Sequence, residues 1–122
     1  MQIDQGDVFW VELLKPTTQG SEQEGQRPWV VVSRGNCNRN RVVVAVPLTS
    51  KPKPPAGFRI AVSASMIVSE PGSGFHPVDS IALCDQVRAL DIGRLQQRIA
   101  KLAAPARISV IELGLAYLFD IR

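Results

Sequence analysis

The chain has 122 residues, of which 45% are hydrophobic and 20% are charged, and this predicts one globular domain over residues 1–122. No apolar run approaches the ~18 residues that a membrane-spanning helix requires, and the first residues lack the basic and apolar segments of a secretory leader. We therefore expect a cytoplasmic protein. A net charge of +3 favours polyanions or acidic partners.

The first half of the chain predicts three strands separated by polar segments. Val8–Leu13 is rich in aromatic and branched residues, and Val42–Ser50 has the continuous apolar character of a buried strand. Between them, the polar loop Gly20–Pro28 leads into a third strand over Trp29–Ser33. The proline that ends this loop disfavours helical backbone at Arg27, which should be extended at the entrance of the strand.

The second half predicts two more strands and two helical segments. Phe58–Ser63 alternates with period two, and Ser80–Val87 is expected to be the final strand. Asp91 is expected to cap a helical segment that contains Leu95, Ile99 and Leu102. Pro105 suits the first turn of a last helix, whose apolar positions are Ile108, Ile111, Leu115 and Leu118. The predicted fold class is therefore mainly β: five or six short strands in a small antiparallel barrel with a C-terminal helix.

Several catalytic classes lack support in the sequence. The single histidine, His76, lies in the loop-like stretch SGFHPV, so neither a metal-ligating cluster nor a pair of histidines is present. No GxSxG and no phosphate-binding GxxxxGK[ST] motif occurs. Cys37 and Cys84 are far apart with no CxxC, which favours reduced thiols at structural positions. No metal or cofactor is expected.

The remaining polar residues at strand ends and in loops suit the handling of a phosphodiester without a metal. They are Glu22, Gln23, Arg27, Thr49, Asp85, Gln86 and Arg88. Metal-free cleavage of RNA needs a base for the 2′-hydroxyl proton, a cation facing the phosphorane and a hydroxyl or amide donor. Glu22, Arg27 and Thr49 have these functional groups, whereas Gln86 and Arg88 suit the edges of unstacked bases.

A structural interpretation of the same residues is open at this point. Glu22 and Arg27 are also compatible with an exposed ion pair, which contributes ~0 to 1 kcal/mol. Thr49 is also typical of a strand-end residue that bonds nearby backbone. Asp85 and Arg88 are also compatible with a pair across the sheet.

Four motifs in the same order and spacing resemble the MazF/PemK/Kid toxins. They are GDVFWVEL, GSEQEGQRPWVVVS, VVVAVPLTS and CDQVRALD, and the resemblance runs from Gly6 to the last helix. It implies an SH3-like barrel with a C-terminal helix, a homodimer, and a metal-independent endoribonuclease that cleaves single-stranded RNA to 2′,3′-cyclic phosphate and 5′-hydroxyl ends. It also implies neutralisation by an antitoxin, expected to be a short, acidic and partly disordered segment.

The resemblance also implies roles for individual residues. In the MazF branch Arg27 and Thr49 match the catalytic arginine and threonine, and Glu22 matches the motif glutamate proposed as the base. In the Kid branch the base is the aspartate that corresponds to Asp85, but Leu83 replaces its partner arginine and Ser21 replaces a histidine. The residues expected to bind substrate are Ser21, Gln23, Asp85, Gln86 and Arg88.

Two other functions are compatible with this fold class. One is a gyrase poison resembling CcdB, although such proteins end in Trp-Gly-Ile and this chain ends in Phe119-Asp120-Ile121-Arg122. The other is a non-catalytic module that binds RNA. Glu24, where the family commonly has glycine, has no assigned role.

Overall fold

The computed structural model describes residues 2–13, 25–35 and 37–121. The strands are β1 (Asp7–Leu13), β2 (Gly25–Val31), β3 (Val42–Thr49), β4 (Arg59–Val62), β5 (Ile67–Ser69), β6 (Ser80–Leu83), β7 (Arg88–Asp91) and β8 (Leu95–Leu102). A C-terminal helix follows, in which α1 (Ala104–Ile108), a π-helical stretch (Ser109–Leu115) and α2 (Ala116–Phe119) are continuous. Short 3-10 turns occupy Asn38–Asn40, Ala64–Met66, Cys84–Gln86 and Ile92–Arg94.

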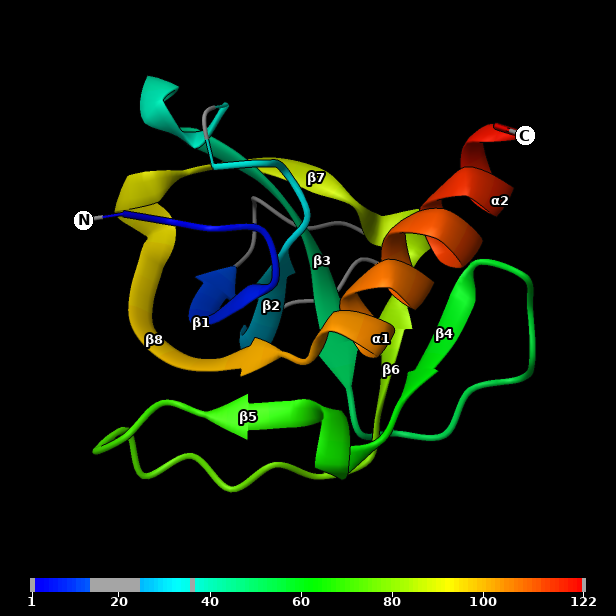
Figure 1. Cartoon of the computed structure of the whole chain (residues 1–122), viewed down its shortest axis with the longest axis horizontal. Coiled ribbons are helices and arrows are strands. Elements are labelled where there is room, and N and C mark those ends of the chain that lie inside the picture. The colour runs from blue at the N-terminus through cyan, green and yellow to red at the C-terminus, as the bar shows by residue number, and fades with distance from the viewer. Residues whose placement is uncertain (1, 14–24, 36, 122) are drawn as a thin grey trace.

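The strands form one curled antiparallel sheet in the order β4-β6-β3-β2-β1-β8-β5, and β7 pairs with β3 beside this path. β3 is the only described strand with three partners, because β7 pairs with its first half and β6 with its last two residues while β2 lies on the other side. The C-terminal helix lies across β3 and β6, and β8 bends around β1 and β2 (Figure 1). The predicted fold class, a small antiparallel barrel with a C-terminal helix, is confirmed.

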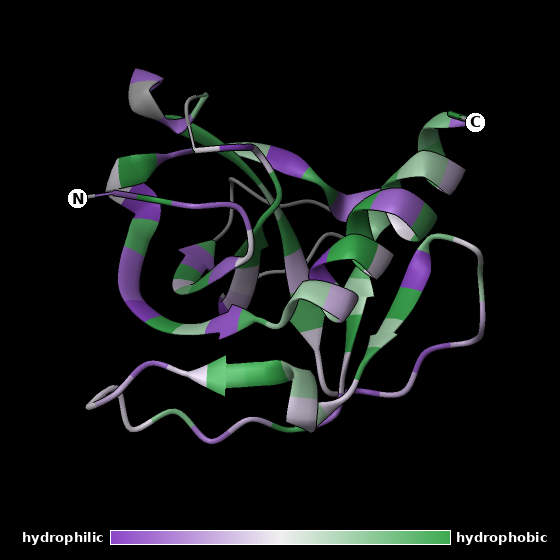
Figure 2. Cartoon of the chain, in the orientation of Figure 1, coloured by the Kyte–Doolittle hydropathy of each residue, from purple (hydrophilic) through white to green (hydrophobic). Residues whose placement is uncertain are grey.

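Both faces of the central strands are buried. Val8 and Val30 belong to the cluster beneath the C-terminal helix, which contributes Val110. Their sequence neighbours Phe9 and Trp29 belong to a second cluster on the opposite face. Because successive side chains in a strand point to opposite faces, burial on both faces requires continuous apolar runs rather than strict alternation. Figure 2 shows the corresponding hydrophobic character of the strands that the helix covers.

The predicted helical segment after Asp91 is wrong. Leu95, Ile99 and Leu102 lie in β8, which pairs antiparallel with β1 through contacts such as Val8 with Ala100. The register shifts twice along this pairing, and these irregularities give the buried residues a spacing that resembles a helix. Asp91 does act as an N-cap, but of a 3-10 turn, where its side chain accepts a hydrogen bond from Gly93 N.

Four further sequence predictions differ from the structure. Ser80–Val87 is not one strand, because β6 ends at Leu83 and the 3-10 turn Cys84–Gln86 carries the chain to β7. β2 begins at Gly25 rather than at Trp29, since pairing with β1 extends it backwards. With β5, β7 and β8, the described residues contain eight strands rather than five or six. Cys37 is exposed, so only Cys84 is at a structural position.

The other elements are confirmed. The first strand, the extended backbone at Arg27, the strand that ends at Thr49 and the strand after Phe58 are all present. The last helix has Pro105 in its first turn, as predicted. Among the described residues, no helix is long and apolar enough to span a membrane.

A glycine in the C-terminal helix permits close packing on the sheet. Gly114 is buried, and a Cβ atom there would clash with Cys84 Sγ and lie 2.7 Å from Ile60 Cγ1. Burial raises the pKa of the Cys84 thiol to about 12, and the negative charge of Asp85 acts in the same direction. The helix is therefore seated directly on the start of β4 and the turn after β6.

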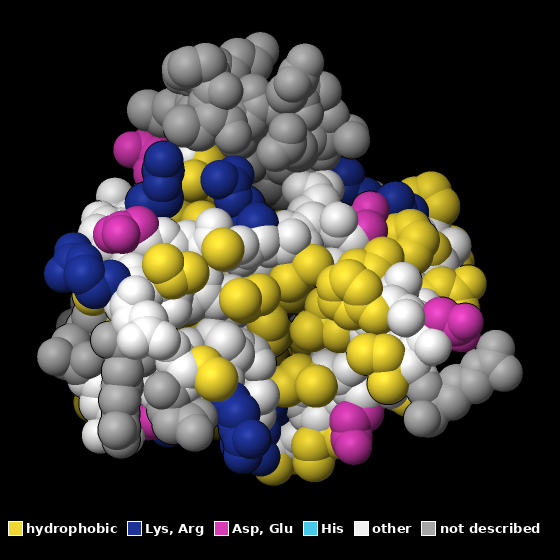
Figure 3. All heavy atoms as spheres, turned by 90° about the horizontal axis from the view of Figure 1, so that it is seen from above, with side chains coloured by type: hydrophobic (Ala, Val, Ile, Leu, Met, Phe, Trp, Pro, Cys, Tyr) yellow, Lys and Arg dark blue, Asp and Glu magenta, His cyan; other side chains and the backbone are white. Residues whose placement is uncertain are grey.

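The outer side of the same helix leaves large apolar side chains exposed. Leu113, Tyr117, Phe119 and Ile121 are 58% to 66% exposed, and Val42 and Val44 of β3 are also accessible. In Figure 3, hydrophobic side chains gather over the side of the molecule where this helix lies. We call these six residues the apolar face. Large apolar side chains exposed in this number are typical of an interaction site.

Replacing Gly114 with alanine should destabilise the fold. Overpacking against Cys84 and Ile60 costs about 1 to 3 kcal/mol, partly offset by the ~1 kcal/mol that alanine gains over glycine in a helix. We expect a net fall in the free energy of unfolding of about 1 kcal/mol or more in urea titrations. Glu112→Ala, an exposed change in the same helix, is the control. A Gly114→Ala variant as stable as the wild type would contradict this packing.

The two thiols should differ in reactivity. Because the pKa of Cys84 is raised from about 9 to about 12, almost none of it is thiolate at pH 8, whereas Cys37 is exposed. Titration of the native protein with a thiol-reactive dye at pH 8 should label one cysteine per chain, and Cys37→Ser should abolish this labelling. Rapid labelling of two cysteines in the native state would show that Cys84 is accessible.

Candidate functional site

Arg27 is a cation near the start of β2. It lies in β2 opposite Val11 of β1 and is half-buried. Its Nε atom is shielded from solvent and has no hydrogen-bond partner among the described residues. Such a donor costs about 1 to 3 kcal/mol when no acceptor replaces water. Gly25, which begins the strand, has a φ of +81°, a conformation that favours glycine.

Thr49 ends β3 and is only 2% exposed. Its Oγ1 accepts a hydrogen bond from Lys51 N at 3.1 Å, so the interpretation that it bonds nearby backbone is confirmed. This bond does not exclude a functional role, because a hydroxyl that accepts still has its own hydrogen to donate. The bond instead fixes the rotamer of Thr49 at the end of the strand.

A split in the sheet brings Arg27 and Thr49 to the same face. The ladder between β2 and β3 ends at the pair Trp29 and Pro47, and β3 then pairs with β6. Pro28 and Pro47 both lack the N–H that a ladder requires, which explains why the pairing stops there. Residues two apart share a face of a strand, so Arg27 and Thr49 lie on the same face as Trp29 and Pro47, on opposite sides of the split.

The third predicted group lies along the other edge of β3. Asp85 and Gln86 are in the 3-10 turn between β6 and β7, and Arg88 begins β7 opposite Ala45. Because β7 pairs with Val42–Ala45 and β6 with the last two residues of β3, this turn lies beside the middle of β3. Asp85 is exposed, and Gln86 and Arg88 are half-buried. The structure therefore places Arg27, Thr49 and this segment around one half of β3.

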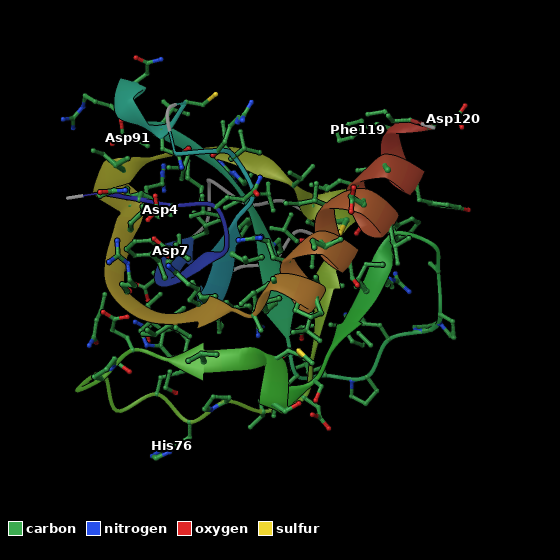
Figure 4. The ribbon with its side chains drawn as sticks, viewed as in Figure 1. Asp4, Asp7, His76, Asp91, Phe119 and Asp120 are labelled. Atoms are coloured by element: carbon green, nitrogen blue, oxygen red, sulfur yellow. The ribbon has the colours of Figure 1, made fainter. Side chains whose placement is uncertain are left out.

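The structural interpretation of Asp85 and Arg88 is not supported. In the described part of the chain, the ion pairs are those of Asp7 with Arg98 at 3.3 Å and with Lys101 at 3.8 Å. Figure 4 shows Asp7 beside Asp4. The Asp7 carboxylate accepts a hydrogen bond from the backbone N–H of Asp4 at 2.9 Å. Asp7 thus holds the N-terminal segment against β8, away from the predicted site residues.

Three of the predicted residues, Ser21, Glu22 and Gln23, lie outside the described residues, as does Glu24. The predicted ion pair of Glu22 with Arg27 is therefore not tested. His76 is exposed in the loop between β5 and β6 and points away from the sheet (Figure 4). No group of three or more His, Cys, Asp or Glu side chains that could hold a metal ion occurs within residues 2–13, 25–35 and 37–121.

A pocket of about 230 Å³ opens where the sheet splits. It extends from the start of β2 and the end of β3 to β5 and the loop before β6. Trp10 and Phe75 contact each other edge to face, with ring centres 5.7 Å apart and planes at 83°. The lining residues are Trp10, Gln26, Arg27, Pro28, Leu48, Ser50, Ile67, Phe75, Val78 and Ser80.

Sequence reasoning missed this pocket and a second cation, Arg59. Arg59 lies opposite Leu83 across β4 and β6, and Leu83 shares a face with Ile81, the partner of Thr49. Nη1 of Arg59 donates to Pro54 O at 2.7 Å, but its Nε is shielded without a partner among the described residues. The alternation in FRIAVS places Arg59 on one face of a strand; it does not show which strands lie beside it.

The fold and the site together define a class of protein. It is a small β-barrel with a C-terminal helix, in which an arginine and a threonine lie where two strands separate. The family model of the PemK-like, MazF-like toxins of type II toxin-antitoxin systems matches residues 4–119. The chain belongs to this family, so the predicted family resemblance is confirmed.

Individual relatives agree with this assignment. The chain is 35% identical to endoribonuclease PemK of Escherichia coli over 91 residues, which are 74% of this chain and 62% of PemK. It is 30% identical to endoribonuclease MazF of Staphylococcus epidermidis over 118 residues, covering 93% of this chain and 92% of that protein.

Solved structures extend the similarity to the fold. MazF from Deinococcus radiodurans has a TM-score of 0.76 at 26% identity and covers 99% of both chains. An endoribonuclease in complex with its cognate antitoxin, from a mycobacterial species, has a TM-score of 0.71 at 19% identity and covers 98% and 97% of the two chains. Solved neighbours of this fold therefore include a toxin bound to its antitoxin.

Proposed function

We propose that this protein is an endoribonuclease toxin that cleaves single-stranded RNA without a metal ion. The observation that carries the proposal is the guanidinium of Arg27, whose Nε has no acceptor among the described residues and which shares a face with Thr49 at the split in the sheet. A phosphate is the acceptor that a planar guanidinium fits best. The family and the two relatives named endoribonucleases support the same activity.

The proposed reaction is an internal transfer at one phosphate. The 2′-hydroxyl oxygen attacks the adjacent phosphorus as Glu22 takes its proton, and the bond from phosphorus to the 5′-oxygen breaks. The leaving oxygen takes a proton from water, which gives a 2′,3′-cyclic phosphate and a 5′-hydroxyl end. Arg27 and Thr49 stabilise the negative charge on the phosphorane. Arg27 remains charged throughout, since a guanidinium does not lose its proton near neutral pH.

The other predicted residues would hold the RNA on either side of this phosphate. Ser21 and Gln23 belong to the loop before β2, and Asp85, Gln86 and Arg88 border β3 on its other side. Asp85 is exposed and lies in the turn beside β3, so it is the alternative candidate for the base.

The proposed partners are RNA, an antitoxin and a second copy of the chain. A net charge of +3 suits a short acidic antitoxin that is partly disordered until it binds. The apolar face suits a homodimer, because a two-fold interface buries the same patch of both copies. We place this activity in the cytoplasm, where messenger RNA is available.

Loss of the guanidinium or the hydroxyl should reduce cleavage while preserving the fold. We expect Arg27→Ala to lower kcat by about 100-fold or more, and Thr49→Val by less, because each removes a group facing the phosphorane. The measurement is mapping of 5′-hydroxyl ends in a long RNA treated in EDTA. Arg34→Ala, which removes the same charge from an exposed turn, is the control. Undiminished cleavage by Arg27→Ala would refute the proposed function.

The two candidate bases can be separated by amide substitutions. If Glu22 is the base, Glu22→Gln should lower kcat by about 100-fold or more, whereas Asp85→Asn should act mainly on KM. Steady-state cleavage of a short RNA at several pH values provides both parameters. The reverse pattern would show that Asp85, and not Glu22, is the base.

A further inference from the structure

The pocket and the candidate catalytic residues both lie where β2 and β3 separate. Along the first residues of β2, Gln26 and Pro28 alternate with Arg27, and along the end of β3, Leu48 and Ser50 flank Thr49. Gln26, Pro28, Leu48 and Ser50 line the pocket, and so does Arg27. Because Arg27 lines the pocket, a group whose phosphate meets Arg27 is adjacent to the pocket.

The pocket has an aromatic and apolar lining, which suits the face of a flat ring. Trp10 and Phe75 form an edge-to-face pair, and Ile67, Val78 and Leu48 complete the apolar lining. The pocket volume of about 230 Å³ lies below the ~300 to 1,000 Å³ of sites for drug-sized ligands. It therefore suits a single ring system rather than two stacked nucleotides.

Polar groups at the pocket are available for the edge of such a ring. The Gln26 amide nitrogen donates to Gln96 Oε1 at 2.8 Å, which fixes the amide and leaves its own oxygen as an acceptor. The Ser80 hydroxyl donates to Val78 O at 2.9 Å and keeps its lone pairs. Ser50 is exposed at the end of β3. Base edges present donors and acceptors together, whereas an aliphatic side chain has neither.

We propose that this pocket binds one nucleobase of the RNA, adjacent to the phosphate that Arg27 contacts. The inference rests on the proposed function and deepens it, because it assigns recognition of one base at the cut site to Gln26, Ser50 and Ser80, beside the aromatic pair of Trp10 and Phe75. Base selection at that position then arises from the starts of β2 and β6 and the residue after β3, and not only from the turn between β6 and β7.

The test separates base binding from cleavage. Trp10 lines the pocket while Trp29 is 2% exposed in the core, so the four nucleoside monophosphates should change tryptophan fluorescence on binding. We expect Phe75→Ala to weaken this binding about fivefold or more, since stacking on an aromatic ring supplies much of the affinity for an unpaired base. Gln26→Ala should shift the preference among the four bases. Val68→Ala, an exposed change in β5 outside the pocket, should leave both unchanged.

The same variants are then compared for cut sites on a long RNA. Relaxed selection at one position in Gln26→Ala and Phe75→Ala, with the overall fold intact by circular dichroism, supports the proposal. If neither variant alters nucleotide binding or cut sites while the wild type cleaves RNA, the pocket proposal is overturned and the proposed function stands. It is equally overturned if Phe75→Ala weakens only the binding of an acidic antitoxin peptide. A wild type that binds nucleotides but cleaves no RNA would refute the proposed function alone.

Discussion

The change of partner along β3 is the constraint on which the rest of the structure depends. β7 pairs with Val42 to Ala45 and β2 with Ala45 to Pro47, but the last two residues of β3 pair with β6. Pro47 lies at the point of change and has no N–H to continue the ladder with β2. The sheet therefore curls at this point and separates, which leaves Arg27 on one side and Thr49 on the other. The same separation opens the pocket.

Local chemistry predicted those features of the fold that do not depend on distant partners. Arg27 is extended because the following proline excludes helical backbone, and the last helix begins at Pro105 because that residue suits a first turn. β8 could not be predicted in this way, since its strand conformation follows from pairing with β1 across most of the chain. Its bulges also hide the period of two, so the spacing of Leu95, Ile99 and Leu102 resembled a helix.

The candidate site was likewise predictable only in part from the sequence. Motif spacing singled out Arg27, Thr49 and the segment from Asp85 to Arg88, and strand pairing explains why they surround one half of β3. The pocket was beyond prediction, because Trp10, Leu48, Ile67 and Phe75 come from four segments whose contact no local pattern encodes. Arg59 was not predicted as a site residue for a related reason. Its importance depends on its position opposite Leu83, which is known only from the strand register.

An unsatisfied guanidinium nitrogen is not by itself a mark of function. Arg98 also has a shielded Nε without a partner among the described residues, yet its charge is neutralised by Asp7 at 3.3 Å and it packs over the ring of Phe9. That arginine is structural, because removing it would leave Asp7 buried with only the more distant Lys101. Arg27 has no carboxylate within ion-pair distance among the described residues. Among the described residues its Nε lacks an acceptor, which an RNA phosphate would supply.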